Sequence, residues 1–203
     1  MSIMIAIPTL GDIKSNCVMS IVKSLFEDKQ NGVIENYGHT TSSTISHARN
    51  TLCNNFLKTT SEWLLFIDSD IDFSYNDIVT IYKRALDNNI KVISGCYFSY
   101  DNEKVYPVSS VLDLNSDLEE VSWFGLGFTL IHRSVLEKTG RKSVNSDSHW
   151  FAETYKDGVY IGEDMYFSEL LNENLIKMYV CPDVKLGHNK NKRVGWEDYV
   201  KQN

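Results

Sequence analysis

Apolar and polar residues in the first half of the chain follow two alternating periods, that of a strand and that of a helix. Four short apolar runs that are typical of buried strands stand at residues 3–8, 33–37, 63–67 and 90–98. Three stretches with apolar residues at helical spacing separate them, at residues 18–26, 45–57 and 78–86. Repeated β-α units of this length predict an α/β fold with a doubly wound, mostly parallel sheet and flanking helices.

The third helical stretch has the clearest start signal. Ser74-Tyr75-Asn76-Asp77 is a candidate capping box, in which the serine and the aspartate satisfy each other's backbone amides. The predicted buried face of this helix holds the apolar residues at helical spacing, namely Ile78, Ile81, Tyr82, Ala85 and Leu86.

After Phe98 the alternation of strands and helices breaks. Residues 99–122 are polar and irregular, and a glycine-punctuated apolar segment follows at Trp123–His132. Gly162-Glu163-Asp164 opens a further helix, which leads to a last strand at 177–181. Residues 141–161 are predicted to form a long surface loop that carries the aromatic residues His149, Trp150, Phe151, Tyr155 and Tyr160.

The most informative local feature is the acidic tripeptide Asp68-Ser69-Asp70, which directly follows the apolar run Trp63–Ile67. In open parallel sheets, ligands bind just outside the carboxyl ends of the strands. Residues at i and i+2 project to the same side about 7 Å apart, and two carboxylates at that distance repel by roughly 2 kcal/mol. A divalent cation would turn this repulsion into attraction. The tripeptide also suits a plain strand-to-loop turn, so it does not identify a site by itself.

Composition and charge exclude several classes of protein. The chain has 203 residues, of which 42% are hydrophobic and 23% charged, as in ordinary globular proteins. No apolar stretch approaches the roughly 20 residues that span a bilayer. The scattered cysteines form no Cys-x-x-Cys pair, which disfavours a zinc site or a disulfide framework and makes a cytoplasmic location the expectation. The net charge of −7 disfavours a broad grip on nucleic acid.

Several short motifs stand in one order along the chain: Ala48-Arg49-Asn50, Phe66-Ile67-Asp68-Ser69-Asp70, Gly125-Leu126-Gly127-Phe128, Gly162-Glu163-Asp164 and Gly187-His188. Together they resemble the glycosyltransferases of the GT-A fold, in particular the compact family-2-like enzymes common in phages and bacteria. The resemblance implies a single GT-A-type, Rossmann-like domain over residues 1–203. A nucleotide-sugar-binding half would span residues 1–100, an acceptor-binding half with a small acceptor-side subregion residues 101–187, and a tail that closes over the donor site residues 188–203.

The resemblance further implies a metal-held nucleoside diphosphate-sugar as donor, with a UDP-sugar as the first expectation. Asp70 would coordinate the metal, Asp68 would contact the ribose or the metal, and His188 would be the C-terminal metal ligand. Oxygen ligands with an imidazole suit Mn²⁺, with Mg²⁺ as the second choice. The cation would neutralise the departing diphosphate. Without the other motifs, a lone histidine after a strand is more often a surface or capping residue.

By the same resemblance, Asp164 is the catalytic base. A carboxylate at a helix start is stabilised in its ionised form, and it would accept the proton of an acceptor hydroxyl as that oxygen attacks the anomeric carbon. The expected outcome is inversion at that carbon. Glu163 would support the reaction, for instance by binding acceptor hydroxyls. The structural alternative for both residues is simple charge complementation of a helix N-terminus.

Further donor-site residues follow from the same comparison of motifs. Arg49 would pair with Asp68 or reach the diphosphate, unless it is a solvated helix residue. Thr9 would touch the nucleotide base, and Ser69 would lie against the donor. Gly125 and Gly127 would let the backbone approach the donor sugar closely. The basic residues Lys190, Lys192 and Arg193 would fold over the diphosphate as part of the tail.

Some features leave alternatives open. An acceptor platform and an ordinary core are equally supported for the four aromatic residues Trp123, Phe124, Trp150 and Phe151. The strand Ile34-Glu35-Asn36-Tyr37 lacks the aspartate that often reads the base in family-2 enzymes, which leaves the preference for uridine open. No Gln-x-x-Arg-Trp motif is present, so transfer of one sugar per event is expected rather than processive synthesis.

The leading hypothesis is therefore a metal-dependent glycosyltransferase that acts on a hydroxyl acceptor, a glycan or another molecule. A nucleic acid acceptor is possible but not favoured by the acidic balance. One alternative is a nucleotidyltransferase or phosphoesterase that uses Asp68 and Asp70 to hold two metals. Another is a non-catalytic module that binds nucleotide-sugars.

Overall fold

The computed structural model describes residues 2–101, 104–110, 113, 115–142, 147–190 and 193–200. Its centre is a 7-stranded sheet in the order β2-β1-β3-β9-β5-β14-β8. These strands are β1 (Ile3–Thr9), β2 (Ile34–Thr41), β3 (Trp63–Ile67), β5 (Val92–Cys96), β8 (Glu119–Val121), β9 (Phe128–His132) and β14 (Met178–Lys185). Strands β8 and β9 run against the direction of the others. The predicted mostly parallel α/β sheet is confirmed.

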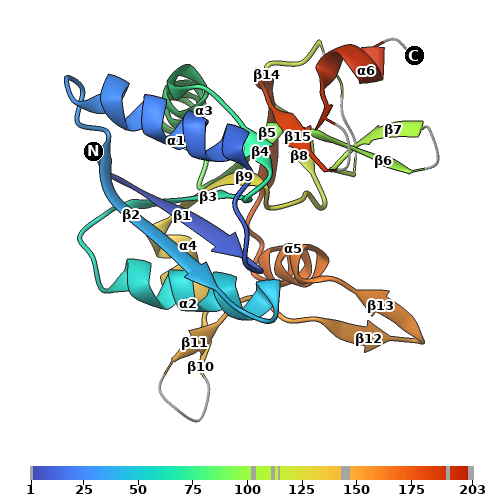
Figure 1. Cartoon of the computed structure of the whole chain (residues 1–203). Coiled ribbons are helices and arrows are strands. Elements are labelled where there is room, and N and C mark those ends of the chain that lie inside the picture. Colours follow the sequence, from blue (N-terminus) through green and yellow to red (C-terminus); the bar gives the residue numbers. More distant parts are fainter. Residues whose placement is uncertain are drawn as a thin grey trace.

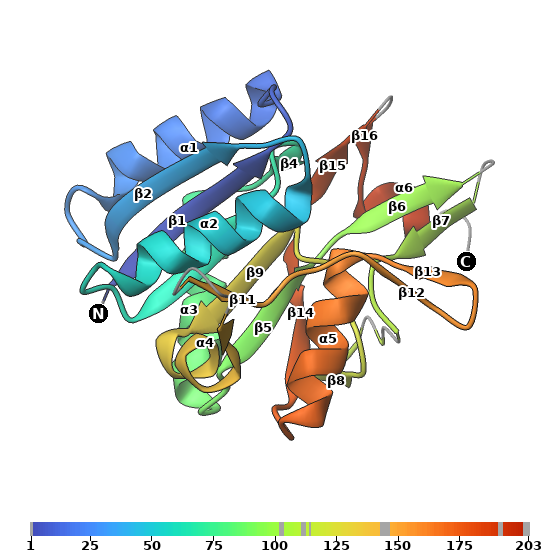
Figure 2. The same ribbon diagram turned by 90° about the horizontal axis from the view of Figure 1, so that it is seen from below.

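Helices cover both faces of this sheet (Figures 1 and 2). One face carries α1 (Ser15–Asp28) and α3 (Tyr75–Asp87), and the other carries α2 (Ile45–Leu57), α4 (Arg133–Thr139) and α5 (Glu163–Glu173). Alternate residues of a strand face opposite sides, so Ile5 joins the core under α1 and α3 while Met4 joins the core under α2. This two-sided burial explains why the strands have no polar alternation.

Local signals in the sequence account for the helix starts. Thr44 caps α2 by accepting a hydrogen bond from the backbone amide of His47. The predicted capping box of α3 is present, because Ser74 and Asp77 each accept a hydrogen bond from the other's backbone amide. In contrast, Gly162 provides no side-chain cap for α5, whose first turn holds Glu163 and Asp164 instead.

Two helices expose apolar residues that follow the helical pattern. In α1 the inward side consists largely of small and polar residues together with Ile21, while Val22 is 40% and Phe26 65% exposed. In α3 the predicted burial of Leu86 is wrong, because this side chain is 40% exposed. Leu86 lies eight positions after Ile78, where the helical rotation has already carried it off the buried face.

The prediction of one long surface loop at residues 141–161 is wrong for the described residues of this segment. Two short hairpins form there, from β10 (Arg141–Lys142) with β11 (Ser148–His149) and from β12 (Thr154–Lys156) with β13 (Val159–Ile161). Residues 143–146 lie outside the described residues. Trp150 and Phe151 are buried, since Asn50 of α2 donates to the Phe151 carbonyl and accepts from the amides of both residues. Hydrogen bonds to the side-chain amide of Asn50, which is distant in the sequence, therefore hold Trp150 and Phe151 in the core.

Short elements gather beside the carboxyl end of the sheet. A hairpin of β6 (Phe98–Asp101) and β7 (Lys104–Pro107) projects there, and α6 (Trp196–Val200) lies next to it (Figure 2). Strand β15 (Gly187–Asn189) pairs with β4 (Ile71–Asp72) and with β16 (Arg193–Val194). Within the described part of the chain, no helix is long and apolar enough to cross a membrane.

We expect the cysteines to be unreactive in the folded protein. Cys17, Cys53, Cys96 and Cys181 are all free and buried, and burial raises the pKa of Cys17 and of Cys96 to about 12. Because the thiolate is the reacting form, a thiol reagent at pH 8 should modify none of them in minutes. Unfolding in guanidinium should release all of them at once, and rapid native labelling would contradict this packing.

Candidate functional site

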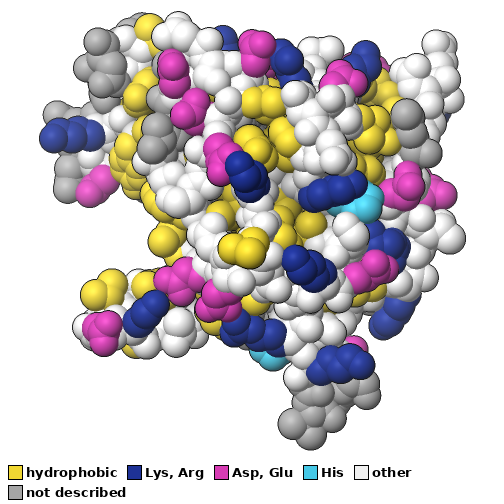
Figure 3. Space-filling model, turned by 180° about the vertical axis from the view of Figure 1, so that it is seen from behind, with side chains coloured by type: hydrophobic (Ala, Val, Ile, Leu, Met, Phe, Trp, Pro, Cys, Tyr) yellow, Lys and Arg dark blue, Asp and Glu magenta, His cyan; other side chains and the backbone are white. Residues whose placement is uncertain are grey.

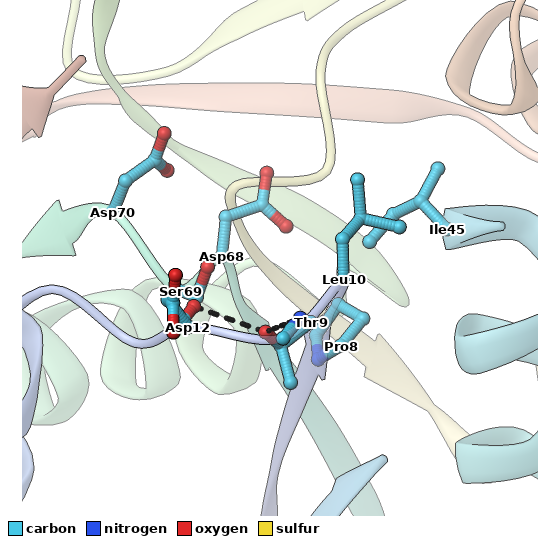
Figure 4. A pocket seen from close by; sticks show the side chains of 9 residues that line it. Pro8, Thr9, Leu10, Asp12, Ile45, Asp68, Ser69 and Asp70 are labelled. Carbon is cyan, nitrogen blue, oxygen red and sulfur yellow. Dashed lines mark hydrogen bonds between the residues drawn. The ribbon is translucent and has the colours of Figure 1, made fainter. Parts of the chain in front are cut away.

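Two cavities meet at the acidic tripeptide that follows β3. The first, of about 360 Å³, lies between this tripeptide and the loop after β1, and Leu10 and Ile45 add apolar walls to it (Figure 4). The second, of about 390 Å³, lies on the other side of the tripeptide and extends to α5 and β15. Asp68 and Asp70 line both cavities.

The two carboxylates of the tripeptide point to the same side of the backbone, as the strand geometry predicts (Figure 4). The backbone of Asp68 is fixed by a hydrogen bond of 2.9 Å from its amide to the carbonyl of Gly127, which directly precedes the neighbouring strand β9. The two side chains differ in their partners, however. Asp68 pairs with an arginine and Asp70 with a histidine.

Arg49 bridges the two sides of the second cavity. Its Nη2 donates to Asp68 Oδ1 at 2.7 Å, and its Nε donates to Glu163 Oε1 at 3.4 Å. The side chain is 2% exposed, which excludes a solvated helix arginine. Nη1 has no hydrogen-bond partner among the described residues. A buried donor without a partner is costly, so a substrate oxygen that reached it would be stabilised.

His188 is held against Asp70 by the pairing of β15 with β4. The carbonyl of Phe98 lies 2.8 Å from Nδ1 of His188 and can only accept, so Nδ1 donates to it and Nε2 faces Asp70. Nε2 and Asp70 Oδ2 are 3.3 Å apart. Burial alone would raise the pKa of Asp70, but the hydrogen bond and charge of His188 and the charge of Lys190 bring it below its ordinary value.

This pair of ligand atoms fits a divalent cation. A carboxylate oxygen and an imidazole nitrogen can both bind a divalent transition metal such as Mn²⁺, and a backbone carbonyl is a common hydrogen-bond partner of the other ring nitrogen in metal-binding histidines. No group of three His, Cys, Asp or Glu side chains among the described residues is placed to hold a metal by itself. Substrate or water oxygens would have to complete such a site.

The first turn of α5 brings two further carboxylates to the second cavity. Asp164 Oδ1 accepts a hydrogen bond of 2.7 Å from the amide of Met165, which leaves Oδ2 without a protein donor among the described contacts. Glu163 points toward Arg49. Burial raises the pKa of Glu163, which Arg49 partly counteracts and Asp164 reinforces. Asp68, Asp70, Asp164 and His188 thus all line one cavity.

Packing explains the two glycines of the Gly125-Leu126-Gly127 segment, whereas the prediction from the sequence was a close approach of the backbone to a donor sugar. Tyr97 occupies the space that a side chain at either glycine would need, and its Oη accepts a hydrogen bond of 2.9 Å from the amide of Gly127. Close packing of Tyr97 therefore requires the glycines. Only Gly125 lines the cavity, and contact of Gly127 with a donor sugar stays a prediction.

Thr9 and Ser69 line the first cavity. The hydroxyl of Thr9 donates to the Asp12 carbonyl at 3.0 Å and accepts from the Gly11 amide, so it stabilises the loop after β1 (Figure 4). Its predicted contact with the nucleotide base would therefore involve its backbone or an additional hydrogen bond.

Lys190 is exposed and lines the second cavity beside Asp70. Of the other predicted tail cations, Lys192 and the side chain of Arg193 lie outside the described residues. Three of the four candidate platform aromatics, Phe124, Trp150 and Phe151, are core residues with at most 2% exposure. Trp123 alone lines the cavity.

Sequence reasoning missed several cavity residues. Tyr97 and Tyr106 line the second cavity, and Leu10 and Ile45 line the first. No local signal marks Tyr97, because a tyrosine inside an apolar strand pattern reads as core. Leu10 could have been found, since a large apolar residue inside the turn Pro8–Asp12 has no core to enter.

Comparisons with known proteins support the fold. No family model and no curated protein matches the sequence. The crystal structure of A197 from STIV aligns with a TM-score of 0.67 and 21% identity, over 96% of this chain and 89% of that chain. The crystal structure of GalNAc-T7 with UDP, GalNAc and Mn²⁺ aligns with a TM-score of 0.54 and 10% identity, over 99% of this chain and 47% of that chain. At such identities the likeness establishes a GT-A-like fold.

Proposed function

We propose that the protein is a metal-dependent glycosyltransferase that moves one sugar from a nucleoside diphosphate-sugar to an acceptor hydroxyl. The observation that carries this proposal is the meeting of Asp70, His188 and Asp164 around one cavity. Two side chains that can bind a metal ion and a separate free carboxylate in the same cavity match the needs of a leaving diphosphate and an attacking hydroxyl.

The donor would lie across both cavities. The apolar side chains of Leu10 and Ile45 suit the base in the first cavity, and the sugar would enter the second. UDP is the first candidate, because the structural neighbour GalNAc-T7 was solved with UDP, GalNAc and Mn²⁺. Lys190 lines the second cavity together with Asp70, and it would meet the negative charge of the diphosphate there.

Asp70 and His188 would hold the metal, with Mn²⁺ favoured over Mg²⁺ because of the imidazole. When bound, the cation supplies positive charge to the departing diphosphate. Asp68 is less suited to direct coordination, because Arg49 already binds its Oδ1. It would instead orient the donor through its second oxygen.

Asp164 would act as the base. It accepts the proton of the acceptor hydroxyl while that oxygen forms a bond to the anomeric carbon. The bond from this carbon to the diphosphate oxygen breaks, and its electron pair leaves with the nucleoside diphosphate. A single displacement of this kind inverts the anomeric configuration.

The arrangement disfavours a two-metal nucleotidyltransferase or phosphoesterase. Such an enzyme needs both Asp68 and Asp70 for cations, yet the guanidinium of Arg49 sits 2.7 Å from Asp68 and repels a second metal there. A non-catalytic nucleotide-sugar binding module would use the same donor contacts. It has no use, however, for a free carboxylate at Asp164.

We expect thermal stabilisation by a nucleotide-sugar only when Mn²⁺ is also present. A ligand that binds only the native state stabilises it by an amount that grows with the logarithm of its concentration divided by its Kd. Here the diphosphate would supply ligands to the metal, and the metal would bind the diphosphate. A thermal-shift panel of nucleotide-sugars with and without Mn²⁺ measures this. The variant His188→Gln should lose the metal-dependent rise, whereas His39→Gln, at an exposed histidine on β2, should keep it. A rise that needs no metal, or that survives in His188→Gln, would contradict the proposed site.

A further inference from the structure

The hairpin of β12 and β13, residues 154–161, projects from the body of the protein beside α5 (Figures 1 and 2). We call it the tyrosine arm. Its cross-strand pair Tyr155 and Tyr160 is 73% and 55% exposed, and Val159 next to it is 61% exposed. The two rings pack edge to face with centroids 5.6 Å apart. Aromatic side chains this exposed on a projecting arm indicate a binding surface rather than part of the core.

The tyrosine arm leads directly into the proposed catalytic helix. Only Gly162 separates β13 from α5. A Cβ added at Gly162 would lie 3.1 Å from Asp164 Oδ1 and 3.9 Å from Tyr160 Cε1. The ring of Tyr160 and the carboxylate of Asp164 therefore both border one small gap. This gap stays open because Gly162 has no side chain. The backbone angles of Gly162, φ −70° and ψ 167°, would allow any residue, so the gap and not the backbone favours glycine.

Charge around the tyrosine arm is predominantly negative. Four carboxylates, of Glu153, Asp157, Glu163 and Asp164, lie on the arm or within three residues of it in the sequence. The arm carries one cation, Lys156, which pairs with Glu169 at 3.9 Å. Figure 3 shows the arm at the lower left, with hydrophobic and acidic side chains together. This combination repels nucleic acid. It suits a neutral sugar, whose ring faces stack on aromatic rings and whose hydroxyls donate to carboxylates.

We propose that the tyrosine arm binds the acceptor and that the acceptor is a neutral glycan. One sugar ring stacks on Tyr160, the next on Tyr155, and the hydroxyl to be modified reaches Asp164 across the gap at Gly162. This inference rests on the proposed function and names its acceptor class. It places the aromatic platform on two tyrosines near Trp150 and Phe151 in the chain, since these two candidate platform residues are buried.

The test uses the whole protein and a panel of neutral oligosaccharides, with binding measured by saturation-transfer NMR and by calorimetry. We expect the wild type to bind at least one member, and Tyr155→Ala/Tyr160→Ala to weaken this binding by about tenfold or more, as loss of two ring contacts predicts. Tyr160→Phe should retain it. The control Tyr37→Ala removes a comparably exposed tyrosine on β2 and should change nothing. Unchanged thermal unfolding in the double variant would show that the fold is intact.

Donor and acceptor measurements separate this inference from the proposed function. In the double variant the rise in unfolding temperature with nucleotide-sugar and Mn²⁺ should stay, while the KM for the acceptor increases more than kcat falls. If no donor stabilises the wild type but the tyrosines still bind an oligosaccharide, the proposed transferase fails and the glycan site stands. Absence of oligosaccharide binding in the wild type would overturn the inference. So would preferential binding of DNA, RNA or a basic peptide that the double variant abolishes.

Discussion

Asp164→Asn is expected to reduce kcat by about 10²- to 10⁴-fold, the usual effect of removing a general base. The reason is that an amide cannot take the proton of the acceptor hydroxyl. The substitution keeps an oxygen that can accept the hydrogen bond from the Met165 amide, so the start of α5 should remain in place. The measurement is steady-state transfer at saturating donor, with donor binding followed by calorimetry.

The matched control for this prediction is Glu173→Gln, which neutralises an exposed carboxylate at the other end of α5. It should leave kcat unchanged. Donor and metal should still bind to Asp164→Asn, which distinguishes an enzyme from a binding module. NMR of the wild-type product should show inversion at the anomeric carbon. Retention, or full turnover by Asp164→Asn, would rule out the single displacement.

Arg49→Met is expected to lower the free energy of unfolding by about 3 kcal/mol. Removal of one partner from a buried ion pair typically costs about 3–5 kcal/mol. The lower end applies here, because the Asp68 and Glu163 side chains remain 28% and 17% exposed and water can reach them. In a chain of this size the loss corresponds to a fall in Tm of roughly 6–12 °C. Urea unfolding measures the free energy directly.

The Arg49→Met defect should shrink as the pH falls. Burial raises the folded-state pKa of Glu163, and Arg49 opposes that rise, so the pKa climbs further in the variant. A carboxyl group with a raised folded-state pKa contributes stability below its unfolded pKa of about 4.3 and loses this contribution as the pH rises through the folded value. The variant should therefore recover part of its stability, relative to the wild type, between neutral pH and about pH 4.3.

A compensated variant provides the control for this second prediction. Arg49→Met combined with Asp68→Asn and Glu163→Gln leaves no unpaired buried charge, so it should recover most of the lost stability. If the single Arg49→Met variant is as stable as the wild type, the ion pairs of Arg49 with Asp68 and Glu163 do not stabilise the fold.

Much of the architecture could be predicted from local pattern. The unbroken apolar run of β3 and the helical spacing in α2 and α3 identify these elements, because a strand or helix buried by its neighbours must carry apolar residues at its own period. The capping box of α3 and the acidic tripeptide after β3 are likewise short-range signals. The same reasoning failed for Leu86 and for the outer side of α1, where apolar residues follow the helical pattern without entering the core.

The sequence by itself therefore determined the class of the sheet, several of its strands, its main helices and the chemical character of the residues at the strand ends. Only the tertiary structure decided which of those residues meet. Arg49 and Glu163 are separated by 114 positions, and His188 reaches Asp70 through a strand pairing that no short motif encodes. Such contacts depend on how distant segments pack, and a period of two or of 3.6 residues carries no information about that packing.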